Sequence, residues 1–197
     1  MPLHNERDEY DISGIELRDD SYTVVQGVIR NKYKALDDTG ETVLRGKQEL
    51  FKLKEKFPFV DGDDEEVFTV TASSIIDIAG DYILADAETD DPVVILDNDF
   101  SMLQDTWTIR DPETNEALAE ITSRGAAVTL ARNLLPFGEV IPHKYEITDP
   151  QDAHVGDIDG QFTLLKDTYE VTIDDASSVP KEPVVAAAMV IDAIQGN

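Results

Sequence analysis

Residues 184–194 read Val184-Val185-Ala186-Ala187-Ala188-Met189-Val190-Ile191-Asp192-Ala193-Ile194. Pro183 precedes this run and Gly196 follows it, which is the usual punctuation of a helix. All of the run except Asp192 is apolar, so a helix here has no face for water and must be buried on every side. It is also too short to span a bilayer. The run therefore predicts a helix over 183–195 on the axis of a barrel.

A spaced repeat upstream of this helix predicts the barrel wall. Each copy has an apolar residue, three further residues, an aromatic residue, and then an apolar residue and an Asp at alternate positions; in the last copy Ile173 replaces the Asp. The alternation is that of a strand with one buried face. The aromatic residues are Tyr33, Phe57, Tyr82, Trp107, Tyr145 and Tyr169. We expect the core to hold Phe57, Tyr82, Trp107, Tyr145 and Tyr169, together with Val185, Met189 and Ile191 of the helix.

The Asp that ends most copies predicts a turn, because its carboxylate can accept hydrogen bonds from backbone NH groups two residues further on. A second apolar stretch follows each turn, so the unit is a β-hairpin. Counting a leading strand near 22–25, about ten to twelve strands result, and antiparallel sheets of that size close to remove their edges. We expect a mostly β fold, a closed antiparallel barrel of about twelve strands in one domain (11–197) behind a flexible stretch (1–10). The interval 123–143 fits a helix or a strand.

Three features together resemble the LURP-one-related family: the hairpin repeat, the stretch Leu165-Lys166-Asp167-Thr168-Tyr169-Glu170-Val171, and the ending 186–194. The resemblance covers roughly residues 30–195. That family belongs to the superfamily of tubby C-terminal-like domains and phospholipid scramblases. It implies a twelve-stranded barrel around a central C-terminal helix. By analogy it also implies lipid handling, since tubby-type domains bind phosphoinositide headgroups and scramblases move lipids, although this chain differs from such relatives in its overall charge.

The charge of the chain is extreme for a protein that folds. Its 197 residues include 42 Asp and Glu against 16 Lys and Arg, a formal net charge of −26, with 41% apolar residues. Such self-repulsion opposes compaction at ordinary ionic strength, but in molar salt the Debye length falls to about 3 Å. The composition indicates adaptation to a salty cytoplasm, as in extreme halophiles. It argues against nucleic acid and anionic membranes as partners.

Cysteine is absent, which excludes disulfides, thiol catalysis and metal sites built on Cys. Residues 1–9 lack the apolar core of a signal peptide. No apolar run approaches the roughly 20 residues of a membrane span. We expect a cytoplasmic protein without a cofactor, whose partners are unknown.

One stretch runs against the acidic composition. Residues 45–56 hold five basic and two acidic residues. Lys52, Lys54 and Lys56 alternate, so on a strand they share one face. With Arg45 they form a candidate site for an anion such as a phosphate headgroup. The alternatives are a solvated outer face, or lysines that protect a strand edge.

A second candidate site is acidic. Asp149, Asp152, His154, Asp157 and Asp159 lie close together in the sequence and offer oxygen and imidazole ligands for a divalent cation. The spacing of an EF-hand is absent. In so acidic a chain, a solvated loop is the alternative.

No catalytic constellation stands out. The string Asp38-Thr39-Gly40 occurs in aspartic proteases, but here it falls on a turn of the repeat. We therefore expect a non-enzymatic barrel that binds an anionic ligand, a lipid headgroup or a protein partner. A metal-dependent hydrolase that uses the loop 149–159 and a scramblase-like lipid-handling protein are the alternatives.

Overall fold

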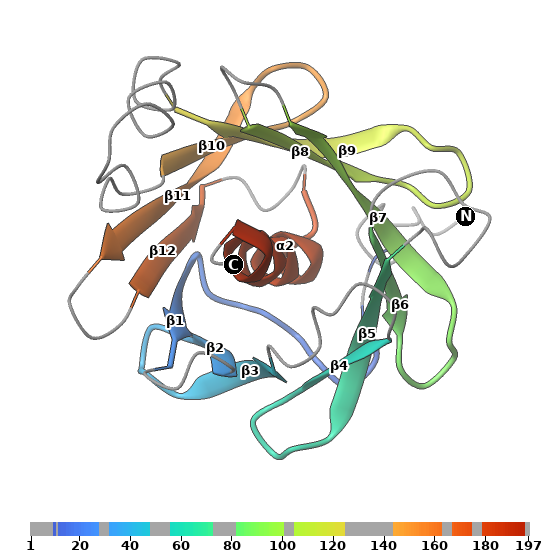
Figure 1. Ribbon diagram of the computed structural model, residues 1–197, viewed down its shortest axis with the longest axis vertical. Helices are drawn as coiled ribbons and strands as arrows, with labels where there is room; N and C mark the ends of the chain where they lie inside the picture. Colours follow the sequence, from blue (N-terminus) through green and yellow to red (C-terminus); the bar gives the residue numbers. More distant parts are fainter. Residues whose placement is uncertain are drawn as a thin grey trace, which may run out of the picture.

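The computed structural model describes residues 10, 12–27, 32–47, 56–72, 82–100, 105–124, 144–162, 167–174 and 179–195. Every described strand pairs antiparallel with its neighbours in the sequence, and the first pairs with the last, so the sheet closes into a barrel (Figure 1). The expected closed barrel is confirmed. Its strands are β1 (Ser21–Gln26), β2 (Lys32–Leu36), β3 (Thr42–Lys47), β4 (Phe57–Val60), β5 (Glu66–Ala72), β6 (Tyr82–Asp86), β7 (Pro92–Phe100), β8 (Asp105–Arg110), β9 (Ala117–Ser123), β10 (Lys144–Thr148), β11 (His154–Phe162) and β12 (Asp167–Ile173).

The helix α2 (Lys181–Gln195) lies inside the ring of strands (Figure 1). Side chains from Lys181 to Ile191 are all buried, none more than 9% exposed. The helix contacts β1 and β2 from the first part of the chain, β8 from its middle and β12 from its last part. A helix with no polar face is thus accommodated by surrounding it with the sheet.

The aromatic residues of the repeat lie where the strands face the helix. Phe57, Trp107, Tyr145 and Tyr169 are between 1% and 6% exposed. Tyr82 is half-buried, and its ring centroid lies 6.1 Å from that of Trp107. Of the undecided stretch 123–143, only Ser123 and Arg124 are among the described residues.

An Asp opens each of five hairpin turns, as the repeat predicts. Its Oδ1 atom accepts a backbone NH two residues on, at 2.8–3.0 Å, in the turns that begin at Asp37, Asp61, Asp86, Asp111 and Asp149. Each turn also needs one residue with positive φ, a position filled by Gly40, Asp64, Asp90, Asn115 and Asp152. The string 38–40 therefore belongs to a turn. Successive strands run in opposite directions, so every second connection lies at the same end, and all five turns lie at one end of the barrel.

Tyr10 and residues 12–20, here together called the clasp, are attached to this turn end. Asp86 and Asp111 each use the second carboxylate oxygen for the attachment. Oδ2 of Asp86 accepts the backbone NH of Ser13 at 2.7 Å, and Oδ2 of Asp111 accepts the hydroxyl of Tyr10 at 2.8 Å. Both carboxylates are buried. The N-terminal segment is therefore part of the packed structure and closes one end of the barrel.

The clasp also holds the first turn of α2. Oε1 of Glu182 accepts the backbone NH of Leu17 at 2.7 Å. The ammonium group of Lys181, on a residue only 9% exposed, donates to the carbonyls of Arg18 and Asp19 and to the carboxylate of Asp20, at 2.6–3.2 Å. These bonds satisfy two charged groups that would be costly to bury without partners.

Replacing Asp111 tests the clasp. We expect Asp111→Ala to lower the free energy of unfolding by about 2–3 kcal/mol, because it leaves Tyr10 and the turn NH groups without their charged acceptor. Asp61→Ala is the matched control, since the Oδ1 of Asp61 accepts two turn NH groups but holds no clasp residue. Denaturant unfolding measures both. Equal losses in the two variants would show that the clasp contributes nothing.

Asp111 also makes the stability of the fold depend on pH. Burial opposes the ionisation of Asp111, but hydrogen bonds from Thr114, Tyr10 and Glu113 outweigh it and hold the pKa of Asp111 below its ordinary value. The pKa is higher in the unfolded chain, so Asp111 stabilises the fold above about pH 4, and this contribution disappears as pH falls through the folded pKa. The melting temperature of Asp111→Ala should consequently fall less between neutral pH and about pH 2 than that of the parent protein.

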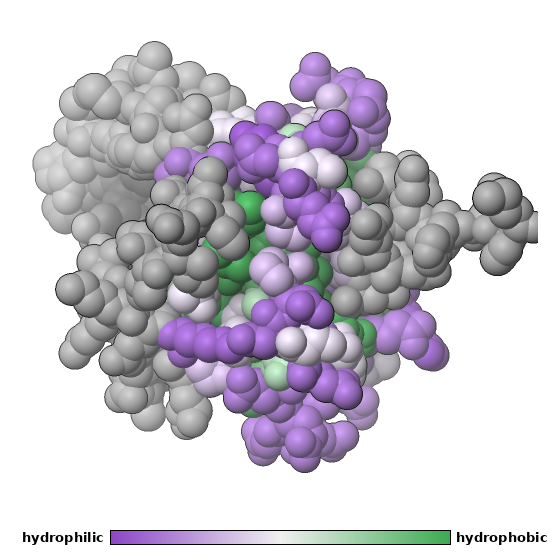
Figure 2. Space-filling view, turned by 90° about the vertical axis from the view of Figure 1, so that its right-hand side faces the viewer, coloured by the Kyte–Doolittle hydropathy of each residue, from purple (hydrophilic) through white to green (hydrophobic). Residues whose placement is uncertain are grey.

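Acidic side chains gather at the turn end. Hydrophilic residues dominate the described part of the face in Figure 2, with hydrophobic residues visible between them. The exposed acids of the first four turns include Asp38, Glu41, Asp63, Asp64, Glu65, Glu88, Asp90, Asp91, Glu113 and Glu116. Much of the net negative charge therefore faces solvent. Within the described ranges, no helix is long and apolar enough to cross a membrane.

Candidate functional site

Basic residues face one another on the hairpin of β2 and β3. These strands pair on either side of the turn 37–41, and the register places Lys34 opposite Arg45 and Lys32 opposite Lys47. Like charges directly opposite on a sheet repel. Four basic residues out of only 16 in the chain thus occupy two facing pairs. Of these four, Lys34 and Arg45 have described side chains, and their facing positive charges would attract an anion.

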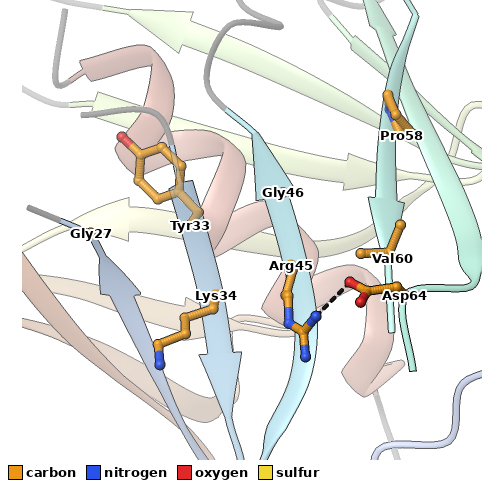
Figure 3. A pocket seen from close by; sticks show the side chains of 8 residues that line it. All are labelled: Gly27, Tyr33, Lys34, Arg45, Gly46, Pro58, Val60 and Asp64. Atoms are coloured by element: carbon orange, nitrogen blue, oxygen red, sulfur yellow. Dashed lines mark hydrogen bonds and ion pairs between the residues drawn. The ribbon is translucent and has the colours of Figure 1, made fainter. Parts of the chain in front are cut away.

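The Lys34–Arg45 pair lies on the outer face of the barrel, and its members differ in their partners. Arg45 is half-exposed and donates to Oδ1 of Asp64 at 2.5 Å (Figure 3). It also donates to the carbonyl of Gly62 at 2.9 Å. Lys34 is exposed, and no described carboxylate lies within ion-pair distance of it. One cation is therefore held in place, and the other is available to a ligand.

The sheet is weakly joined beside this pair, at a place we call the seam. Among the described residues, two register pairs connect β3 to β4, Arg45 with Val60 and Gly46 with Phe59, whereas seven connect β11 to β12. A cavity of about 490 Å³ lies at the seam. Its lining residues, drawn in Figure 3, are Gly27, Tyr33, Lys34, Arg45, Gly46, Pro58, Val60 and Asp64.

Two residues account for the seam. Pro58 has no NH group to donate to a neighbouring strand, and proline within sheets is confined to edges and irregular places. Gly46 allows the ring of Phe59 to lie against β3, because a Cβ at position 46 would approach Cε1 of that ring to 2.6 Å. The ring has little freedom to move away, since it stacks on Phe68 with centroids 4.5 Å apart.

The structure separates the basic residues that the sequence grouped together. Arg45 borders the cavity, whereas Lys56 is exposed just before β4 and forms an ion pair with Asp90 in the turn between β6 and β7. Lys52 and Lys54 lie outside the described residues. The basic residue opposite Arg45 in the strand register is Lys34, which was not predicted from the sequence. Pairing residues outward from the turn 37–41 would have found it.

Four of the five residues of the second candidate site have a partner for the side chain among the described residues, and Asp152 is the exception. Asp149 accepts the backbone NH groups of its own turn, and Asp152 is the turn residue with positive φ. His154 lies between Glu146 at 3.1 Å and Asp174 at 3.2 Å.

The two remaining acids of this group pair with basic side chains. Asp157 forms an ion pair with Arg124, and Asp159 forms one with Lys144 at 3.0 Å. Among the residues that the structure describes, no three His, Asp or Glu side chains are placed to hold a metal ion. The geometry favours a solvated, ion-paired outer face here.

A comparison with protein families bears on the whole barrel. The model of a family described as LURP-one-related matches residues 42–192, from β3 to the far part of α2. The chain belongs to the LURP-one-related family. The resemblance drawn from the hairpin repeat and the C-terminal helix is thereby confirmed. The match includes Arg45 and the seam, while β1 and β2, with Lys34, precede it.

A solved structure is similar to this LURP-one-related chain over most of its length. It is the X-ray structure of a protein from Arabidopsis thaliana, with 12% sequence identity and a TM-score of 0.55, and the match covers 89% of this chain and 91% of that one. At this identity the likeness shows the fold alone. A comparison with curated proteins finds no match.

Proposed function

We propose that this LURP-one-related protein is a non-enzymatic binding barrel that takes an anionic ligand at the outer face of β2 and β3. The observation that carries the proposal is the ammonium group of Lys34, which has no ion-pair partner among the described residues and lies opposite Arg45 in a chain with a net charge of −26. A salt-rich cytoplasm belongs to the same proposal and is supported by composition only.

The isolation of Lys34 is unusual in this protein. Acids are so abundant that every other basic side chain the structure describes has an acidic partner. The ion pairs are Arg18–Glu16, Arg45–Asp64, Lys56–Asp90, Arg110–Asp97, Arg124–Asp157, Lys144–Asp159 and Lys181–Asp20. A lysine without an ion-pair partner beside a second cation can form charge-assisted hydrogen bonds to an external anion.

The two cations have different roles in the proposed site. Lys34 supplies the charge that the ligand neutralises. Arg45 is oriented by Asp64 and Gly62, and since a guanidinium has five NH donors, it retains donors for the ligand. Both side chains reach solvent, so the ion-pair contribution is modest, about 1 kcal/mol at most. Binding to the charge alone should be weak and should decrease as salt is added.

Charge reversal at Lys34 tests this function. We expect Lys34→Glu to weaken the binding of inorganic phosphate at about 0.1 M ionic strength by about tenfold, because it replaces an attractive charge with a repulsive one. Lys144→Glu is the matched control, since it changes the net charge equally on a strand that does not line the cavity. Isothermal titration calorimetry measures both. No phosphate binding by the parent protein, or equal losses in the two variants, would contradict the proposal.

A further inference from the structure

We propose that the ligand is a monoanionic amphiphile: its acid group lies at Lys34, and its apolar chain enters the cavity at the seam. This inference rests on the proposed anion site and adds the chemical class of the ligand. Single-chain carboxylates are the simplest members of that class.

The position of the cavity indicates that it extends from the outer face toward the interior. Neighbouring residues of a strand point to opposite faces of a sheet. Tyr33 and Lys34 both border the cavity, although Tyr33 is 2% exposed and Lys34 faces solvent. Gly46, which is buried, and Arg45, which is half-exposed, both border it as well. A ligand can therefore keep its charged end outside and extend inward at the seam.

The size and lining of the cavity fit an apolar chain. A volume of about 490 Å³ falls within the range of about 300–1,000 Å³ of small-molecule sites. An inorganic anion would leave most of it empty. Away from the charged mouth, the described lining residues are Pro58, Val60, the Tyr33 side chain and glycine backbone. Of these, only the Tyr33 hydroxyl is a polar side-chain group, and it already accepts a hydrogen bond from Gln26 at 2.8 Å.

The charges at the mouth fit one negative charge. Arg45 is compensated by Asp64, so among the described lining residues the ammonium group of Lys34 is the charge without an ion-pair partner. A second negative charge on the ligand would lie close to the Asp64 carboxylate and be repelled.

In the salt-rich solvent that the acidic composition indicates, binding of the ligand needs an apolar contribution. At molar salt the Debye length is about 3 Å, so an exposed lysine attracts an anion only weakly. Burial of apolar surface is not screened and can be strengthened by salt. In such a solvent the apolar chain has to supply most of the affinity, while Lys34 fixes the orientation of the ligand.

A chain-length series tests the inference. Acetate, hexanoate, octanoate and decanoate are titrated calorimetrically in about 1 M KCl, each below its micelle-forming concentration. We expect the affinity to rise about fourfold for each added methylene until the cavity is filled. Lys34→Gln should weaken every member by a similar factor. Val60→Asn, which places an amide in the cavity wall, should instead flatten the dependence on chain length. Lys144→Gln is the control and should change neither quantity.

The possible outcomes separate this inference from the function on which it rests. An affinity that depends on Lys34 but not on chain length would overturn the amphiphile and leave the anion site standing. Chain-length dependence that decanol reproduces and that Lys34→Gln does not affect would overturn both. If neither phosphate in low salt nor decanoate in high salt binds, both proposals fail. Unchanged melting temperatures in the variants show that the fold is intact, as expected for side chains that are exposed or half-buried.

Discussion

A chain that lacks residues 184–197 is expected to be insoluble or unfolded. Removing the helix would empty the centre of a barrel whose inward side chains pack on it, and the cost would exceed the roughly 5–15 kcal/mol that keeps a typical domain folded. Substitution within the helix gives a graded version of the test. Met189 is 1% exposed, and Met189→Ala should cost about 2–5 kcal/mol. Circular dichroism and denaturant unfolding measure these effects.

The control for the truncation removes only residues 196 and 197, which follow the helix. We expect it to melt at the temperature of the parent protein. A soluble product of the longer deletion that melts cooperatively would contradict the role of α2 as the centre of the core. A cost below about 1 kcal/mol for Met189→Ala would contradict it too, because fully buried methionines lose more than that on truncation.

Lowering the salt concentration is expected to destabilise the protein strongly. Between about 1 M and 0.1 M KCl the Debye length grows from about 3 Å to 10 Å, so repulsion among the acids begins to act between neighbouring turns. A loss of about 3–5 kcal/mol would lower the melting temperature by roughly 10 °C or more, since each kcal/mol shifts a domain of this size by about 2–4 °C. Differential scanning fluorimetry at a series of salt concentrations measures the shift.

The control for salt is a neutral osmolyte such as sucrose, which favours the compact state without screening charge. We expect sucrose at about 0.1 M KCl to recover only part of the stability that molar KCl provides. A melting temperature that does not change with salt would remove the interpretation of the acidity as an adaptation to salt. Equal recovery by sucrose and KCl would show that charge repulsion is not the cause.

Much of the fold was predictable because its signals are local and repeated. Each Asp turn is a short stretch whose hydrogen bonds join residues two to four apart, so a residue such as Asp61 indicates its own conformation. The period of the strands and the uniformly apolar run of α2 are equally direct. The clasp was not predicted, because Tyr10 contacts Asp111, 101 residues away, and no local pattern records that contact.

The candidate site was less predictable because it depends on pairing across strands. Arg45 was identified from composition, but its neighbour Lys34 lies eleven positions earlier and becomes adjacent only through the register of β2 and β3. The cavity depends on Pro58 and on the fit of Phe59 over Gly46, which is a matter of packing.

Closeness in the sequence also suggested that the acidic residues of 149–159 lie together more than they do in the structure. Of the acidic group 149–159, His154 has its nearest partners, Glu146 and Asp174, on one neighbouring strand and just after another. Asp157 and Asp159 face basic residues from other segments. Only the side chains of His154 and Asp157 in this group approach each other among the described residues, at 3.8 Å, because the turn and the strand direct the other side chains elsewhere.

The central claim is that a ligand binds between the cations of β2–β3 and the seam. The most direct test is an NMR titration of the isotope-labelled protein with decanoate, in which the backbone amide chemical shifts are monitored. The largest changes are expected at Gly27, Lys34, Arg45, Gly46 and Val60, and in Lys34→Gln the same changes should require a higher decanoate concentration. Changes centred on other strands, or none at saturating decanoate, would contradict the claim.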